Sequence, residues 1–423
     1  MAKNGITEHV GQDYYLLGAG FSRAISQHMP TLNELQTAVL RELDIPTDAL
    51  RAFGNNLEEW MSYLSVEQPW VSDQDNTRNA ATFLDASTAV DRCIQEAEAQ
   101  ALAGGPPEWL ARLVWHWCDT SSAVATFNYD LLVERTSTHL RRVGHWADLY
   151  AMPLTERWPV GTSRAISASS PSASVFKMFK LHGSTNWAYG GPKAPVSDRI
   201  VLKRPGGSWR VEHNEREDTT GRSASLFDDL VPLIIPPTSS KSSFYSNFSL
   251  RAQWRKAAET LRNAKSLTII GYSFPPSDLG ARHFVTDSLQ SVPVTIVDYN
   301  REIADRTEQF LSGERNIEKF SGEDAVKNFV NKRCGQLIKW GIEYGPNGWQ
   351  PYINVNGEDA LRHLAQPAVS SHLAADDKHA LGWVEIEVLH RWPTIREHAL
   401  LDHGADHTLA QLAYISSAEN RDT

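Results

Sequence analysis

Short apolar runs that end in glycine or in polar residues recur along the chain from residue 14 to residue 298. Five of these runs are predicted to be buried strands, over residues 14–17, 122–130, 175–183, 266–271 and 292–298. Helical periodicity follows two of the runs directly, over residues 277–289 and 301–311. Strands that alternate with helices are typical of a parallel sheet that carries helices on both faces. The pattern therefore predicts an α/β fold built on a parallel sheet.

Two inserts interrupt this alternation, and the first of them, over about residues 50–118, is predicted to be helical. One apolar helix face comprises Leu57, Trp60, Met61 and Leu64, at the i, i+3, i+4, i+7 spacing. The sequence Gly-Gly-Pro-Pro at 104–107 separates two helices of this insert. The second insert, over about residues 186–235, is predicted to be β-rich, with a polar loop at 203–225.

The character of the sequence changes beyond about residue 335. Two strand-like runs, 337–344 and 349–355, flank a turn that contains Asn-Gly, which is a hairpin signal. Residues 383–389 alternate with a period of two. We therefore predict a first domain over 1–335 and a small β-rich C-terminal module of unassigned role over 336–423.

Composition narrows the class of protein. The 423 residues carry 41 basic and 51 acidic side chains, so the net charge is 41 − 51 = −10, and direct nucleic-acid binding is not expected. The three cysteines, Cys93, Cys118 and Cys334, lie far apart and provide neither a disulfide framework nor a four-thiolate zinc site. No signal segment is visible at the start and no apolar run approaches about 18 residues. These observations predict a cytoplasmic protein that does not span a membrane.

The ends of the predicted strands carry the residues that suggest chemistry. They comprise Gly18 to Gly20, Asn128 to Asp130, His182 with Gly183, Gly271 to Ser273, and Asp298. Ligands of open parallel sheets bind beyond the carboxyl ends of the strands, so this set predicts a nucleotide pocket. A Gly-Ala-Gly turn lets backbone amides approach a diphosphate, although Arg23 stands where the dehydrogenase fingerprint has its third glycine. Each feature alone also has a structural interpretation: a tight turn, turn-forming Asn and Asp residues, or a core histidine.

Six segments together resemble the sirtuin-like superfamily, in particular its divergent zinc-less branch of bacterial NAD hydrolases from anti-phage defence. They occur in the order of that family, at residues 18–24, 126–130, 180–187, 234–238, 269–274 and 294–298. The resemblance covers about residues 12–320. It implies a parallel-sheet, Rossmann-like, sirtuin-type NAD-binding domain that contains both inserts.

The resemblance also implies an activity, which is hydrolysis of NAD+ to ADP-ribose and nicotinamide during abortive defence. Its catalytic residues would be Asn128, which holds the ribose or a water, His182, which removes a proton, and Asp130, which shapes the site. The implied NAD-binding residues are Gly18, Ala19, Gly20, Ser22 and Arg23 at the diphosphate, Gly271 and Ser273 at phosphate or ribose, and Asp298 at the adenosine ribose.

No zinc is expected, because the deacylase sirtuins hold zinc with two cysteine pairs after the His-Gly motif, and here only Cys334 follows it. Water is therefore a more plausible acceptor than an acyl group. A second possible metal cluster, Asp402 to His407, has His403 and His407 at helical spacing, but Gly404 interrupts it. Polar residues at a helix end are the favoured interpretation of that cluster.

Two other functions stay open. An NAD-dependent protein deacylase or ADP-ribosyltransferase would share the pocket but need an acceptor site. A non-catalytic NAD or ADP-ribose sensor or scaffold would bind without turnover, and would have no need of the pair Asn128 and His182. The resemblance further implies a homo-oligomer, restrained by itself or by a partner such as a separate ATPase or an Argonaute-like protein.

Overall fold

A computed structural model of the chain describes residues 11–140, 142–143, 146–151, 175–189, 200–202, 207, 209, 231–235, 247–276, 278–311, 316–334 and strands between 336 and 390. The chain divides into two compact units. The first comprises residues 1–106 and 117–329, and the second comprises residues 107–116 and 330–423. All the site residues predicted above lie in the first unit.

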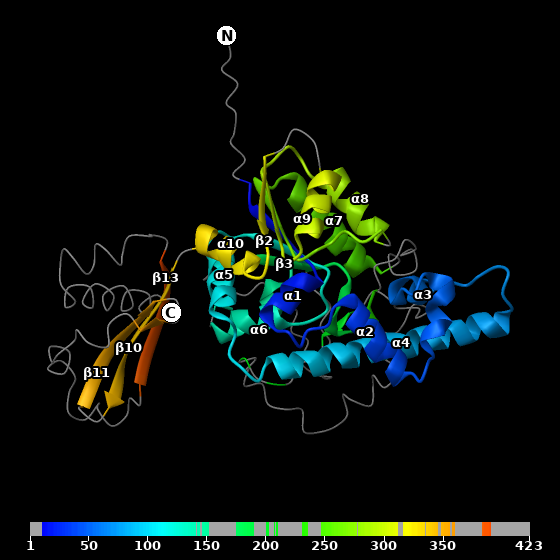
Figure 1. Cartoon of the computed structure of the whole chain (residues 1–423), viewed down its shortest axis with the longest axis horizontal. Helices are drawn as coiled ribbons and strands as arrows, with labels where there is room; N and C mark the ends of the chain where they lie inside the picture. Colours follow the sequence, from blue (N-terminus) through cyan, green and yellow to red (C-terminus); the bar gives the residue numbers. More distant parts are fainter. Residues whose placement is uncertain are drawn as a thin grey trace, which may run out of the picture. The chain divides into compact units, whose positions relative to one another are not determined.

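A six-stranded sheet, in which all neighbouring strands run parallel, forms the centre of the first unit (Figure 1). In spatial order the strands are β3 (Lys177–Lys180), β2 (Ala123–Thr126), β1 (Asp13–Leu17), β7 (Ser266–Ile270), β8 (Val294–Asp298) and β9 (Ile317–Ser321). The strand order reverses between β1 and β7, and such a reversal opens a crevice at the carboxyl ends of the strands. The predicted α/β fold with a parallel sheet is confirmed.

Helices cover both faces of this sheet, and β1 shows how the sequence achieves this. α1 (Ala19–Ile25) follows β1, and α9 (Arg301–Phe310) follows β8. α7 (Phe248–Arg262) precedes β7, and α8 (Leu279–Ser288) follows it. Tyr14 and Leu16 belong to the buried cluster that contains the apolar sides of α7 and α8. The ring of Tyr15 lies 5.3 Å from that of Trp117, at the end of α5 (Glu108–Asp119). Side chains alternate along a strand, so a continuously apolar strand is buried on both sides.

The helical insert contains the 3-10 helix η1 (Thr47–Phe53), α3 (Leu57–Leu64), α4 (Asp73–Ala101) and α5, and α2 (Leu32–Glu42) precedes it. The predicted apolar face of α3 is buried, and α4 packs against α2 and α3 (Figure 1). The break between α4 and α5 falls at the predicted 104–107. Although α4 is 29 residues long, no helix of the described residues is apolar enough over a sufficient length to cross a membrane.

The second insert contributes a three-stranded antiparallel sheet. Its strands are β4 (Gly183–Tyr189), β5 (Val201–Leu202) and β6 (Val231–Ile234), in the order β5-β4-β6. This sheet begins at residue 183, and the parallel strand before it ends at Lys180, not at the predicted 183. His182 therefore lies in the short turn between β3 and β4. Most of the predicted loop at 203–225 lies outside the described residues.

The sixth parallel strand was not predicted. β9 is at the edge of the sheet, and its sequence Ile-Glu-Lys-Phe-Ser is too polar to resemble the central strands. It is followed by α10 (Ala325–Arg333).

The second unit contains an antiparallel sheet. Its strands are β10 (Gln336–Gly345), β11 (Gly348–Val355), β12 (Glu358–Asp359) and β13 (Trp383–His390), in the order β12-β11-β10-β13. Gly345 pairs with Gly348, so β10 and β11 form the hairpin that Asn-Gly predicted.

Candidate active site

The loop after β2 carries Asn128 and fixes its side chain from within the chain. The Asn128 N–H donates to Thr126 Oγ1 at 3.0 Å, which tightens the turn at the strand end. The side-chain Nδ2 donates to Gly18 O and to Ser22 Oγ, each at 2.8 Å. Both hydrogens of the carboxamide nitrogen are therefore used, and Oδ1 is the acceptor atom of this half-buried side chain.

Ser22 links Asn128 to Asp130 through a chain of two hydrogen bonds. Ser22 Oγ donates to Asp130 Oδ2 at 2.6 Å, and the N–H of Leu132 donates to Asp130 Oδ1 at 3.1 Å. Asp130 and Ser22 are both buried. These hydrogen bonds join α1, the loop after β2 and the start of α6 (Leu132–His139). The Ser22 hydroxyl, predicted to lie at a diphosphate, is engaged in holding Asn128.

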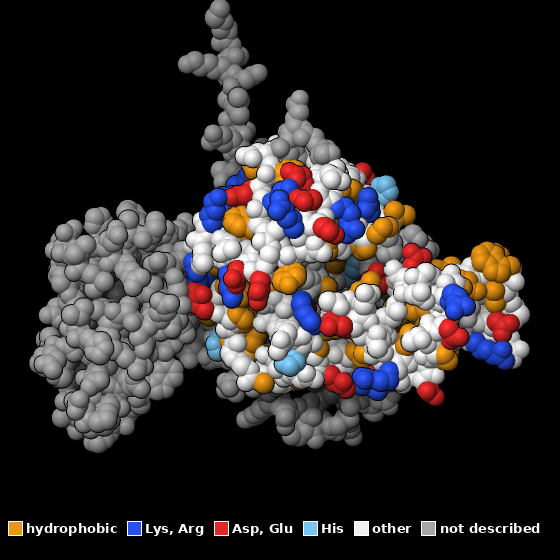
Figure 2. All heavy atoms as spheres, in the orientation of Figure 1, with side chains coloured by type: hydrophobic (Ala, Val, Ile, Leu, Met, Phe, Trp, Pro, Cys, Tyr) orange, Lys and Arg blue, Asp and Glu red, His pale blue; other side chains and the backbone are white. Residues whose placement is uncertain are grey.

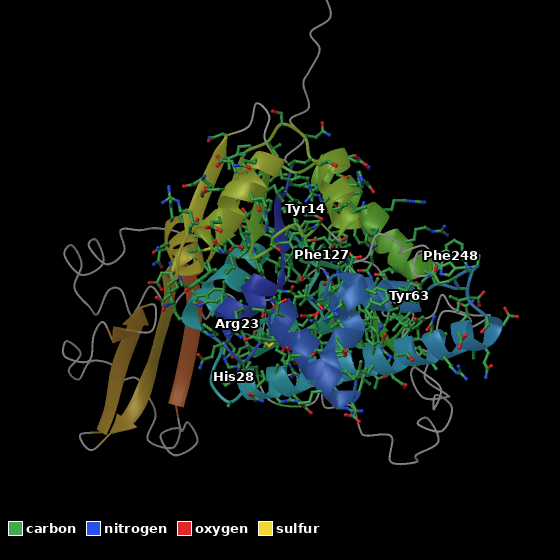
Figure 3. The ribbon with its side chains drawn as sticks, turned by 45° about the vertical axis from the view of Figure 1, so that its right-hand side comes forward. Tyr14, Arg23, His28, Tyr63, Phe127 and Phe248 are labelled. Atoms are coloured by element: carbon green, nitrogen blue, oxygen red, sulfur yellow. The ribbon has the colours of Figure 1, made fainter. Side chains whose placement is uncertain are left out.

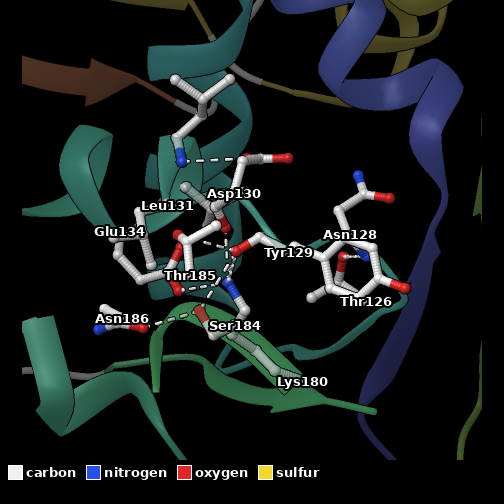
Figure 4. Close-up of polar contacts among 12 residues, drawn as sticks. Thr126, Asn128, Tyr129, Asp130, Leu131, Glu134, Lys180, Ser184, Thr185 and Asn186 are labelled. Carbon is white, nitrogen blue, oxygen red and sulfur yellow. Dashed lines mark hydrogen bonds and ion pairs between the residues drawn. The ribbon is translucent and has the colours of Figure 1, made fainter. Parts of the chain in front are cut away.

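The buried side chain of Lys180 holds the loop after β2 through its backbone. Lys180 Nζ donates to Asp130 O at 2.5 Å and pairs with Glu134 Oε1 at 3.1 Å (Figure 4). Tyr129 O accepts the Thr185 N–H at 3.0 Å. Lys180 and Glu134 are fully buried, and buried charges of this kind persist only when they are paired.

The helical insert reaches the same loop through Glu98 of α4. Glu98 Oε2 accepts the Leu131 N–H at 2.9 Å, and the Glu98 carboxylate also pairs with the buried Arg135. Burial raises the pKa of Glu98, and the charge of Arg135 opposes this shift. Segment 128–131 is thus held by contacts from β3, β4, α1 and α4.

His182 occupies the turn between β3 and β4, and its neighbour Gly183 explains why the turn has this shape. Gly183 has φ +86°, and a Cβ atom there would lie 1.9 Å from Leu233 O, so only glycine fits. The His182 carbonyl accepts the Ile235 N–H at 2.9 Å. The imidazole is buried, with its centroid 4.6 Å from the ring of Phe127. Phe127 directly precedes Asn128 in the chain, so the residue that packs on His182 adjoins the other predicted catalytic residue.

Asp278 is a residue of this site that sequence reasoning missed. Its Oδ2 atom lies 3.6 Å from His182 Nε2 and accepts the Tyr272 hydroxyl at 2.7 Å. Its Oδ1 atom accepts the Ala281 N–H at 3.0 Å, which caps α8. An aspartate just before a helix signals an N-cap, but nothing in the sequence signals its proximity to His182.

Gly18, Gly20 and Gly271 let the loops after β1 and β7 pack closely at the switch point, which is the place where the strand order reverses. A Cβ on Gly20 would lie 2.8 Å from Gly271 Cα, and one on Gly18 would lie 2.6 Å from Gly271 O. The Gly18 N–H donates to Ile270 O at 3.0 Å, and the Gly20 N–H donates to Gly271 O at 2.9 Å. These two amides therefore donate within the chain. Contact of Ala19 and its neighbouring glycines with a diphosphate stays a prediction.

Arg23 is engaged away from the N-terminus of α1. Its guanidinium donates to Met29 O at 2.9 Å and to Glu34 Oε2 at 3.1 Å. Glu34 is the capping-box acid of α2, and in Figure 3 Arg23 lies on the α1 and α2 side of the unit, whereas Phe127 lies near its centre. This geometry gives Arg23 a partner other than the predicted diphosphate.

The ends of β7 and β8 carry Ser273 and Asp298. Asp298 is buried and its Oδ1 atom accepts the Asn300 N–H at 2.8 Å. Burial raises the pKa of Asp298, while the Asn300 N–H and the charge of Arg306 oppose the shift. Arg306 Nη2 also donates to Ser273 O at 3.4 Å. This exposed arginine, which was not predicted, therefore interacts with residues at the ends of both strands.

Within the part of the chain that the structure describes, no group of three His, Cys, Asp or Glu side chains is arranged to hold a metal ion. The cluster Asp402 to His407 lies outside the described residues.

Comparison with known proteins adds no relative. No protein-family profile matches the chain. No curated protein has significant sequence similarity to it.

The fold thus brings the predicted residues to one edge of the parallel sheet, in two groups. Asn128, Asp130 and His182 gather at the ends of β2 and β3, and Gly271, Ser273 and Asp298 follow β7 and β8 on the other side of the switch point. The surface is hollowed near the middle of this unit, where a histidine side chain is visible (Figure 2). An oriented carboxamide and an imidazole beside a carboxylate can position a polar substrate and accept a proton.

Proposed function

We propose that the chain is an NAD+ hydrolase that releases nicotinamide and ADP-ribose. The observation that carries the proposal is the fixed arrangement at the ends of β2 and β3. There, Asn128 is locked by Gly18 O and Ser22, and His182 packs on the adjoining Phe127 ring. The strand order supports it, because dinucleotides bind where this order reverses.

The reaction that suits these groups needs no general acid. Nicotinamide leaves from a pyridinium as a neutral ring, and the ribose develops oxocarbenium-like charge, as in glycoside hydrolysis. In the proposed mechanism the oriented carboxamide of Asn128 holds the nicotinamide ribose or the water. His182 takes a proton from that water or from a ribose hydroxyl. Ser22 and Asp130 act through Asn128 and are positioning residues.

The binding energy for the adenosine half is assigned to the ends of β7 and β8. The Asp298 carboxylate would accept hydrogen bonds from the vicinal ribose hydroxyls. Interactions this far from the broken bond hold substrate and transition state equally.

In a cell, the resemblance to defence proteins leads us to propose that the activity depletes NAD+ during phage infection. Such an enzyme needs restraint, so we propose a homo-oligomer regulated by itself or by a partner ATPase or Argonaute-like protein. Light scattering of the purified chain, alone and with the product of a neighbouring gene, tests this regulation.

Product analysis tests the function. The full-length chain is incubated with NAD+, with and without an acyl-lysine peptide and a strong metal chelator, and the products are separated chromatographically. We expect equimolar nicotinamide and ADP-ribose, independent of peptide and of chelator. Acylated ADP-ribose would instead identify a deacylase, a modified protein would identify an ADP-ribosyltransferase, and NAD+ bound without turnover would identify a sensor.

A further inference from the structure

A buried carboxylate faces the imidazole of His182 from an element distant in sequence. Asp278 is completely buried at the start of α8, 3.6 Å from His182 Nε2. This distance suits an ion pair with a protonated imidazole and is longer than a hydrogen bond. Catalytic hydrogen bonds are often long before substrate is bound and tighten in the complex.

Two aromatic rings also contact the imidazole of His182. Phe127 lies against one side of the ring, and the Trp254 ring of α7 has its centroid 6.2 Å away. Neither aromatic side chain can neutralise an imidazolium. The buried carboxylate of Asp278 lies close enough to the imidazole to stabilise an imidazolium.

Tyr272 holds the carboxylate of Asp278 in place. Its hydroxyl donates to Asp278 Oδ2, the same oxygen that faces His182. Burial, followed by the charge of Asp278, raises the pKa of Tyr272 well above its ordinary value, so the phenol stays a donor. Glu58 of α3 and Arg282 of α8 are the more distant charges that act on this phenol, with opposite signs.

We propose that Asp278 is the positioning residue of His182, and that its carboxylate orients the imidazole and stabilises the imidazolium formed when His182 accepts a proton. A base oriented by a third group is a recurring arrangement in enzymes. No bond to Asp278 forms or breaks: the proton passes from water or a hydroxyl to His182, and Asp278 stays ionised. The catalytic part of this inference rests on the proposed function, whereas the His182–Asp278 pair does not.

Two variants separate charge from structure. Asp278→Asn removes the charge and keeps an oxygen that can cap α8, because asparagine is as good an N-cap as aspartate. Tyr272→Phe keeps the charge and removes a hydrogen bond that partly neutralises it. Asp305→Asn is the matched control, since it removes an exposed carboxylate of α9 that pairs with Lys319.

The main measurement is the titration of His182 by NMR in the full-length protein with labelled histidine, assigned with His182→Gln. We expect the midpoint of Asp278→Asn to fall by about one pH unit or more, because a nearby anion favours the charged imidazole. We expect the midpoint of the His182 titration to rise in Tyr272→Phe and to stay unchanged in Asp305→Asn. With NAD+, the acid limb of the kcat/KM profile should move with the titration.

Opposite shifts in the two variants are what a merely structural role would not produce. A folded Asp278→Asn protein with an unchanged midpoint, or both variants shifting downward together, would overturn the proposal. If Asp278→Asn fails to fold, Tyr272→Phe decides: a rise supports the pair and no change refutes it. Titrations that shift as expected in a protein without NAD+ turnover would refute the proposed function alone.

Discussion

The two halves of the sheet edge differ in how firmly they hold their polar groups. At the ends of β2 and β3, Asn128 donates two hydrogen bonds to Gly18 and Ser22, and Asp130 accepts one from Ser22 and one from Lys180, which also forms a buried pair with Glu134. At the ends of β7 and β8, Asp298 accepts one local N–H, and Tyr299 is 74% exposed. The first half is a preorganised set of groups, whereas in the second half the buried Asp298 has a single local hydrogen bond beside an exposed Tyr299.

This difference assigns different tasks to the two halves. Bond cleavage depends on groups that are fixed before the substrate arrives, since small displacements reduce the rate strongly. Binding of a distant part of the substrate tolerates groups that adjust. Variants of the first half should therefore change kcat or stability, and variants of the second half should change KM.

The largest effect is expected for Lys180→Met. It leaves the Glu134 carboxylate buried without its cation, and breaking a buried pair in this way costs about 3–5 kcal/mol of unfolding free energy. Urea unfolding followed by fluorescence measures the loss. The control is Lys256→Met, whose pair with Glu259 is exposed on α7 and should contribute less than about 1 kcal/mol. Equal stability of the two variants would show that the loop does not depend on the buried pair.

Ser22→Ala should lower kcat with little change in KM. The substitution removes a hydrogen bond from both Asn128 and Asp130 and frees the carboxamide to rotate, so we expect a loss of about 100-fold in NAD+ turnover. Steady-state kinetics measure both constants. Ser26→Ala, in the turn after α1, is the control and should behave as the parent. A normal kcat for Ser22→Ala would show that the hydrogen bonds from Asn128 through Ser22 to Asp130 take no part in the mechanism.

Asp298→Ala tests the second half and should raise the KM for NAD+ more than it lowers kcat. Loss of a charged acceptor is worth about 1.5–3 kcal/mol, or about one to two decades in apparent affinity. The carboxylate also repels a 2′-phosphate, so the parent should prefer NAD+ over NADP+, although Arg306 is near enough to reduce that preference. Asp287→Ala, exposed on α8, is the control. An unchanged KM, or equal use of NADP+ by the parent, would contradict the assignment.

The smallest expected effect is a pH-dependent change in melting temperature when Asp298 is replaced by asparagine. Burial raises the pKa of Asp298 above its ordinary value of 3.8, so the folded protein binds this proton more tightly than the unfolded chain. That stabilisation is fully present below pH 3.8 and is lost as the pH rises through the folded-state pKa. Asp298→Asn should thus melt about 2 °C above the parent at pH 7, with the gap closing toward pH 3. Calorimetry across this range measures the gap, and a variant that is less stable at pH 7 would contradict the cause given for the shift.

The elements that the sequence predicted well are those whose pattern is set by burial alone. Continuous apolar runs identified five parallel strands, since a strand covered on both faces has no polar side. The edge strand β9 has polar side chains that face solvent and so carries no such signal. The third strand was predicted too long because the apolar run continues through the turn into β4.

The sequence was sufficient to predict which residues lie at strand ends, but not which side chains contact one another. Parallel strands bring their carboxyl ends to one edge, so Asn128, His182 and Asp298 were correctly expected at a common edge. The partner of His182 is 96 residues away, as 278 − 182 gives, and no local pattern joins them. Lys180 and Arg306 were likewise missed, because their roles depend on tertiary contacts.

The most direct test compares Asn128→Ala with Asp298→Ala in one experiment, in which NAD+ binding is measured by calorimetry and nicotinamide release under single-turnover conditions. The account predicts that Asn128→Ala binds NAD+ but releases no nicotinamide. Asp298→Ala should bind NAD+ about one to two decades more weakly and, at saturation, release nicotinamide at close to the parental rate. Parental release by Asn128→Ala, or an equal loss of the release rate in both variants, would contradict the division of the site into a cleaving half and a binding half.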